Sequence, residues 1–178
     1  MADEDAQSFQ DGRRRLLAGL DLERNQLVRN IETCRIRDID RPFIADWSLK
    51  DIVGHVATWE AEVVSALREL VAGRRPPLLD FDEAKLDAWN RDHVERKRDL
   101  NFWIVYEQLK GGRARLGDVL EEISDETLAD DSSPEYRLIH SLLDHDRSHW
   151  HEIAAVLAGM QGARRQGPES IPAEANAS

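Results

Sequence analysis

Apolar residues recur at helical spacing along four long stretches of the chain, and this periodicity is what most constrains the fold. The stretches span residues 7–33, 48–71, 101–123 and 138–160. A shorter helical segment is expected at 82–98, with Asp82 as its N-cap. No alternation of apolar and polar residues is long enough to suggest a strand. The sequence therefore predicts an all-α fold, a four-helix bundle with one short extra helix.

Capping signals mark both ends of the second stretch. Ser48 is a natural N-cap, and Asp51, three residues on, makes a variant of the capping box. Gly73 follows the last apolar position, and Pro76 and Pro77 forbid continuation of a helix. We therefore expect a helix from 48 to 71.

The remaining segments are expected to be connections and ends. Residues 1–6 form an acidic lead-in, 34–47 a charged connection, and 124–133 an acidic loop before a helix that Pro134 opens. Gly111 and Gly112 fall inside the stretch 101–123, where they either kink the helix or admit a close neighbour; we favour the second. One domain over 1–160 and a disordered tail over 161–178 are expected.

The last helical stretch separates its four histidines into two pairs. At about 100° per residue, His145 and His149 lie about 40° apart at the margin of the apolar stripe. His140 and His151 fall on the outer face by the same step. Because side chains at i and i+4 share a face, the first pair is suited to bind a metal ion in common.

A third histidine occupies the same position on the second stretch. His55 lies at the margin of an apolar stripe that runs through Ile52, Val56 and Val63. Three histidines with an open position form a known catalytic zinc arrangement, and imidazole also suits nickel, iron and copper. The alternative is that each is an ordinary half-buried histidine. We predict His55, His145 and His149 as ligands of one divalent metal ion.

Three carboxylates could support such a site. Glu60 and Asp146 lie toward the core by their helical angles, and a buried carboxylate is costly without a partner. Each of these, or Glu152, could orient a ligand imidazole or act as a base toward water. An ordinary salt bridge between helices is the alternative. Glu60 and Asp146 are the predicted catalytic residues.

Composition and motifs exclude several functions. The net charge of -11 and the pI near 5.0 argue against nucleic-acid binding. No apolar run approaches the ~20 residues of a membrane span, and the acidic N-terminus shows no signal peptide, so we expect a cytoplasmic protein. Cys34 is the only cysteine, so an intrachain disulfide is impossible. Phosphate-loop, GxSxG, HExxH and di-iron Glu-x-x-His motifs are absent.

Three sequence patches resemble the DinB-like (YfiT-like) superfamily. WSLKDIVGHVATWE at 47–60 is similar to the opening of its second helix, and LIHSLLDHDRSHWHEI at 138–153 to its last helix with HxxxH. DAWNRDHVERKR at 87–98 resembles the ClbS/DfsB-like branch. One departure is Trp150, which stands where family members often have a second histidine directly after HxxxH.

This resemblance implies an up-down-down-up bundle whose long crossover contains the segment 82–98. It assigns metal binding to His55, His145 and His149, with nickel or zinc as the metal and a homodimer as the assembly. The activities that it implies are hydrolysis, thiol transfer with a low-molecular-weight thiol and, in the ClbS-like branch, resistance to a genotoxin.

Three functional hypotheses follow. The leading one is a metal-dependent hydrolase or thiol S-transferase that acts on a small electrophilic molecule. The second is a metal-free, ClbS-like binding or resistance protein, with a cavity lined by Trp59, Trp103 and Trp150. The third is a structural or dimerisation bundle, whose histidines would pair only with carboxylates such as Asp146.

Overall fold

The computed structural model describes residues 2–165, and helices dominate it. The long helices are α1 (Ala2–Thr33), α2 (Leu49–Val71), α4 (Phe102–Leu120) and α6 (Pro134–Arg165). Their connections contain the helices α3 (Glu83–Arg96) and α5 (Asp125–Ala129), and the 3-10 helices η1 (Ile36–Asp38) and η2 (Pro77–Asp80). Two short strands, β1 (Pro42–Ile44) and β2 (Trp47–Ser48), pair as an antiparallel hairpin.

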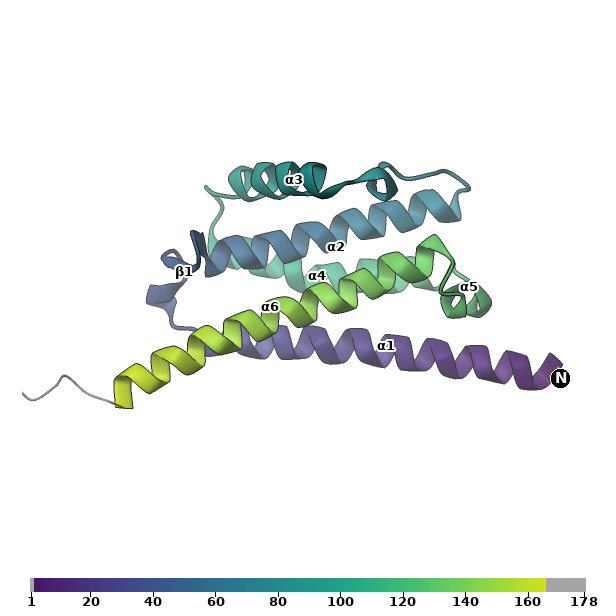
Figure 1. The fold of residues 1–178 in the computed structure, drawn as a ribbon, viewed down its shortest axis with the longest axis horizontal. Coiled ribbons are helices and arrows are strands. Elements are labelled where there is room, and N and C mark those ends of the chain that lie inside the picture. The colour runs from purple at the N-terminus through teal and green to yellow at the C-terminus, as the bar shows by residue number, and fades with distance from the viewer. Residues whose placement is uncertain (1, 166–178) are drawn as a thin grey trace, which may run out of the picture.

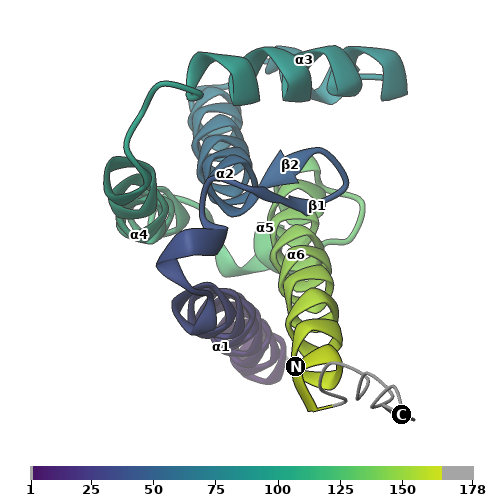
Figure 2. The same cartoon turned by 90° about the vertical axis from the view of Figure 1, so that its left-hand side faces the viewer.

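The four long helices form the predicted bundle. In Figure 1, α1 and α6 run in one direction along the long axis and α2 and α4 in the other, which confirms the up-down-down-up order. Because α2 and α4 are parallel, the chain that connects them must run back along the length of the bundle. The helix α3 lies in this crossover connection. Figure 2 shows α3 outside the core, crossing over α2. None of the helices within residues 2–165 is long and apolar enough to cross a membrane.

The predicted caps explain where the helices begin. The Ser48 side chain accepts a hydrogen bond from Asp51 N at 3.2 Å, and Asp51 Oδ2 accepts one from Ser48 N at 2.9 Å. This reciprocal pair is the predicted capping box, which satisfies backbone donors that the first turn leaves free. Asp82 caps α3 in the same way by accepting from Lys85 N at 2.8 Å.

Short elements and helix ends differ from the sequence prediction. The segments 34–47 and 124–133 were predicted as loops, but they contain the hairpin and α5. Phe43 of the hairpin is 8% exposed, so burial of this ring stabilises a strand pair too short to show alternation. The helix α1 already begins at Ala2, and α6 continues to Arg165 into the predicted tail. Residues 166–178 of that tail lie outside the described residues.

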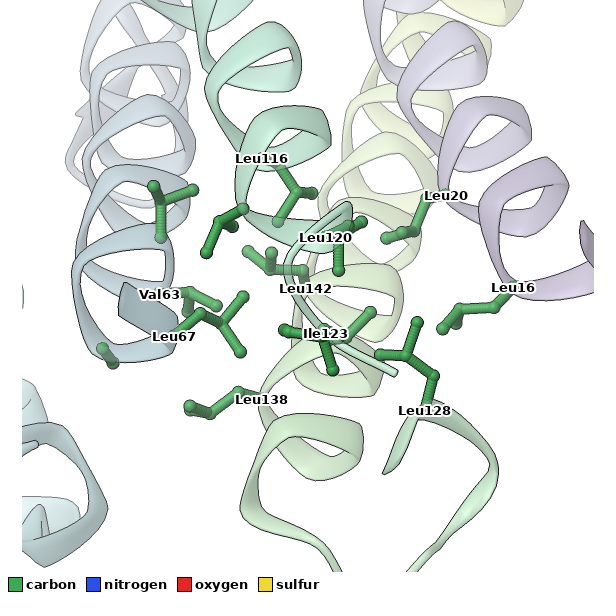
Figure 3. Packing of buried hydrophobic residues seen from close by; sticks show 14 of the residues in the cluster. Leu16, Leu20, Val63, Leu67, Leu116, Leu120, Ile123, Leu128, Leu138 and Leu142 are labelled. Carbon is green, nitrogen blue, oxygen red and sulfur yellow. The ribbon is translucent and has the colours of Figure 1, made fainter. Parts of the chain in front are cut away.

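Buried apolar side chains form two clusters at different heights of the bundle. The first lies toward α5 (Figure 3) and includes Leu16, Leu20, Val63, Leu67, Leu116, Leu120, Leu138 and Leu142. The second lies toward the hairpin and includes Leu27, Ile31, Leu49, Ile52, Val56, Val105, Leu109 and Ile153. Each long helix contributes to both clusters, so the residues between them lie at the middle of the bundle.

Candidate metal centre

The three predicted histidines meet where α2 packs against α6. His55 Nε2 lies 2.8 Å from His145 Nε2, and His149 Nε2 lies 3.3 Å from the same atom. One ring nitrogen from each histidine falls within 4.8 Å of the other two. The shared margin of the two apolar stripes therefore brings the imidazoles together, as the sequence predicts. His140 and His151 are absent from this group; His140 stacks on Tyr136 instead, with ring centres 4.0 Å apart.

Burial keeps the three imidazoles neutral. Burial lowers the pKa of His55 to about 3, assisted by the charges of His149, His93 and Lys97. It lowers the pKa of His145 well below its usual value and also lowers that of His149, which Glu152 partly offsets. A neutral imidazole has a free lone pair on one ring nitrogen, which is what a metal ion requires.

Glu152 orients one of these rings. Its Oε2 lies 3.0 Å from His149 Nδ1, one turn along α6. Because a carboxylate accepts, the hydrogen of a neutral His149 is placed on Nδ1, and the Nε2 lone pair then faces the other two histidines. The predicted supporting role of Glu152 in orienting an imidazole agrees with this contact.

The donor set fits a divalent metal ion. Nitrogens held at ~2.0–2.1 Å from a tetrahedral ion lie about 3.4 Å apart. The 3.3 Å spacing in the triad is close to this value, and the 2.8 Å spacing needs only a small widening. His55 Nδ1 and His145 Nδ1 are buried and have no hydrogen-bond partner among the described residues, so neither ring is tied to another orientation.

The neutral histidines predict that metal-free protein loses stability in acid. Because the folded pKa of His55 lies near 3 and an unfolded histidine titrates near 6.5, unfolding takes up a proton between these values. Stability is therefore full above about pH 6.5 and falls as the pH drops toward 3, by up to ~1.4 kcal/mol per pH unit for each such group.

Urea unfolding between pH 7.5 and 4.5, with a chelator present, checks this dependence. His55→Gln should flatten the decline relative to wild type, whereas His151→Gln on the exposed outer face should leave it unchanged. Equal slopes for wild type and His55→Gln would show that His55 titrates alike in the folded and unfolded chain.

The predicted catalytic carboxylates lie in a buried ion-pair network beside the triad. Arg24 donates to both oxygens of Asp146, at 2.8 Å from Nε and 3.1 Å from Nη2, and to Glu60 Oε2 at 3.1 Å from Nη1. Arg113 Nη2 donates to Asp146 Oδ2 at 2.7 Å, and its Nη1 lies 2.9 Å from Glu60 Oε1. Two guanidinium groups thus neutralise two carboxylates.

This network joins all four long helices. Arg24 comes from α1, Glu60 from α2, Arg113 from α4 and Asp146 from α6, between the two apolar clusters. Glu60 and Asp146 are fully buried and Arg24 is 5% exposed. Burial by itself lowers the pKa of Arg24, but the negative charges of Asp146 and Glu60 outweigh this effect, and the pKa is raised. These contacts are salt bridges between helices, which the sequence analysis gave as the alternative to a catalytic role. A catalytic role for Glu60 or Asp146 stays a prediction.

Of the aromatic side chains around the triad, Trp59 was predicted only as a lining residue of the metal-free cavity, and the others were not predicted at a site. Trp47 of the hairpin has its ring centre 5.1 Å from that of His55, and Trp59 lies 5.8 Å from His145. On α3, Trp89 contacts Trp59 at 5.6 Å and stacks on His93 at 4.1 Å. Trp89 and His93 are four residues apart on the predicted helix 82–98, so the sequence indicates that they share a face of that helix. It does not indicate which other helix this face contacts.

The tryptophans of the metal-free hypothesis lie in three different surroundings. Trp59 contacts His145, whereas Trp103 is 59% exposed at the start of α4. Trp150 donates to Glu23 Oε2 at 2.7 Å, between α6 and α1. The predicted lining of one cavity by all three is therefore wrong, because their helices present them to different neighbours.

Comparison with protein families agrees with the fold. The family model of the DinB superfamily matches residues 9–153. The chain belongs to the DinB superfamily. The part of this DinB-superfamily protein that matches extends from α1 into α6 and includes all three histidines of the triad. Searches of curated proteins and of solved structures gave no significant match.

Proposed function

We propose that this DinB-superfamily protein is a metal-dependent enzyme. His55, His145 and His149 would hold one divalent ion, nickel or zinc, and the reaction would be hydrolysis or thiol transfer to a small electrophilic molecule. The observation that carries the proposal is the convergence of three neutral imidazoles, with Nε2 atoms 2.8 and 3.3 Å apart. An ion bound there supplies Lewis acidity toward a substrate, a water or a thiol.

The protein's own residues prepare the site for such chemistry. The imidazoles are neutral ligands, so they leave the positive charge of a bound ion undiminished. Trp47 and Trp59 lie against His55 and His145, and His55 is buried. Glu152 fixes the orientation of His149. These features favour a reactive cation in partly buried surroundings.

The arginine contacts favour a supporting role for the two buried carboxylates. To act as a base, Asp146 would have to give up hydrogen bonds to Arg24 and Arg113, which is costly in a buried site. Asp146 directly follows His145 on α6, and its charge raises the pKa of His149 against the effect of burial. We therefore favour Asp146 as an electrostatic support of the triad, and Glu60 as its neutralised neighbour.

Elemental analysis of protein purified without a chelator or a His-tag tests the metal site. Wild type should contain about one nickel or zinc ion per chain, and His145→Ala should lose it. Because loss of a supporting partner already costs ~10–100-fold in affinity, loss of a ligand should cost at least ~100-fold. His140→Ala, on the same helix but outside the triad, is the matched control and should retain the metal. Wild type that takes up neither metal would refute the proposal.

A second candidate function, metal-free binding of a small apolar molecule, is favoured by a separate cavity. The cavity has a volume of about 300 Å³ and lies at the hairpin end between α1, η1, α2 and α4. Its lining is mostly apolar and aromatic: Ile31, Glu32, Cys34, Ile36, Ile39, Leu49, Phe102, Trp103 and Tyr106. Ligand binding that survives metal removal and is lost in Trp103→Ala would support this candidate.

A further inference from the structure

The crossover helix α3 brings aromatic side chains to the triad from outside the bundle. Trp89 meets Trp59 edge to face, with ring centres 5.6 Å apart and planes at 81°. Trp59 in turn lies over His145 at 5.8 Å with planes at 35°. A continuous aromatic wall, Trp59 and Trp89, therefore runs from the triad to α3. An aromatic wall offers flat apolar faces, which bind planar rings better than branched aliphatic groups.

His93 holds Trp89 in this position. The two rings stack at 4.1 Å, and His93 Nδ1 lies 2.9 Å from the Trp89 carbonyl oxygen, so this nitrogen donates the hydrogen bond. Trp59 contacts both Trp89 and His145, so the wall and the triad belong to one site.

The wall contains an unused hydrogen-bond donor. Trp59 Nε1 is buried and has no acceptor among the described residues. A buried indole N–H normally has a partner, and leaving it without one costs free energy. Because Trp59 lies directly against His145, a ligand at the triad is well placed to supply the missing acceptor atom.

The charges around the triad favour an oxygen with negative charge as this acceptor. Glu152 is bonded to His149, and Asp146 is neutralised by arginines. Lys97, half-buried one turn beyond His93, donates to the Gly54 carbonyl at 3.2 Å and forms no ion pair with a carboxylate among the side chains that the structure describes. A bound metal ion would add to this uncompensated positive charge.

The helix α3 completes the wall, because its Trp89 is half-buried against Trp59 of α2. We infer that the triad accepts a planar aromatic compound bearing a carbonyl or carboxylate oxygen, whose ring packs on the wall and whose oxygen accepts a hydrogen bond from Trp59 Nε1. This inference rests on the proposed function, because it assumes a metal ion at the triad.

Two probes that differ only in their apolar group test the inference. Benzohydroxamate and acetohydroxamate present the same metal-binding hydroxamate group. The first carries a phenyl ring where the second carries a methyl group. Calorimetry on zinc- or nickel-loaded wild type should show roughly tenfold tighter binding of benzohydroxamate. Trp89→Ala should reduce this ratio to about twofold. Trp59→Phe, which keeps a ring but removes the N–H, should weaken both probes roughly fivefold. Ile104→Ala, at an exposed side chain of α4 that belongs to neither candidate site, should change neither affinity.

Metal content measured on the same samples separates the two proposals. If wild type binds no metal, the proposed function fails, and this inference fails with it. If the metal is bound but the two probes have equal affinities, or Trp89→Ala keeps the wild-type ratio, this inference alone is overturned. Unchanged affinities in Trp59→Phe would overturn the role of Trp59 Nε1.

Discussion

Arg24→Met is expected to lower the free energy of unfolding by about 3–5 kcal/mol, because it leaves two buried carboxylates with one arginine. Arg24 supplies two hydrogen bonds to Asp146 and one to Glu60. Methionine fills similar space but cannot neutralise charge, so the excess carboxylate must be protonated or hydrated inside the bundle. For a chain of this size, we expect the melting temperature to fall by roughly 6–20 °C.

Arg14→Met on the same helix is the matched control. Arg14 pairs with Asp11 at the surface, where its side chain is 67% exposed and water screens the interaction. We expect no resolvable change in its melting temperature. Thermal unfolding of both variants at pH 7 measures the difference. A small effect of Arg24→Met would mean that water reaches Asp146 and Glu60 and that the network is not a buried one.

The network has a consequence for the candidate metal site, because Asp146 and His145 are consecutive residues of α6. Contacts from Asp146 to α1 and α4 hold this turn of α6 at a fixed height and rotation. Glu60 lies on α2 only five positions after His55 and is held by the same two arginines. The ion pairs therefore position both helices that carry the triad, which gives the buried charges a role beyond stability.

Local sequence patterns predicted the features that depend on a single helix. Ser48 with Asp51, and Asp82 with Lys85 N, are interactions within one turn, so the helix starts follow from neighbouring residues. The triad could also be predicted, because the stripe margin of each helix indicates which side chains face a partner.

Features that depend on which helix lies opposite could not be predicted in this way. The helical angles place Glu60 and Asp146 inward, but nothing local shows that Arg24 and Arg113 face them across the bundle. The same limit applies to Trp89, which lies on the crossover and meets Trp59 only because α3 crosses α2. The hairpin was missed because strands of three and two residues are too short to show a period.

The adjacent glycines of α4 should respond to alanine with opposite signs. In an exposed helix interior, Gly→Ala normally raises stability by ~0.5–1 kcal/mol. At Gly111 the new Cβ meets only the flexible end of the Arg115 side chain, at 3.4 Å, so Gly111→Ala should be stabilising. At Gly112 the Cβ would overlap the carboxylate of Glu60. This close approach confirms the second of the two explanations offered for the glycine pair.

Gly112→Ala should therefore cost about 2–4 kcal/mol, despite the better helix propensity of alanine. A glutamate in a loose environment could turn away from the methyl group. Glu60 cannot do so cheaply, because it is fully buried and its oxygens face Arg24 and Arg113. Urea unfolding of the two alanine variants measures both signs in one experiment. A stabilising Gly112→Ala would show that the Glu60 carboxylate does not lie against α4, and the network that joins the four helices would then have to be redrawn.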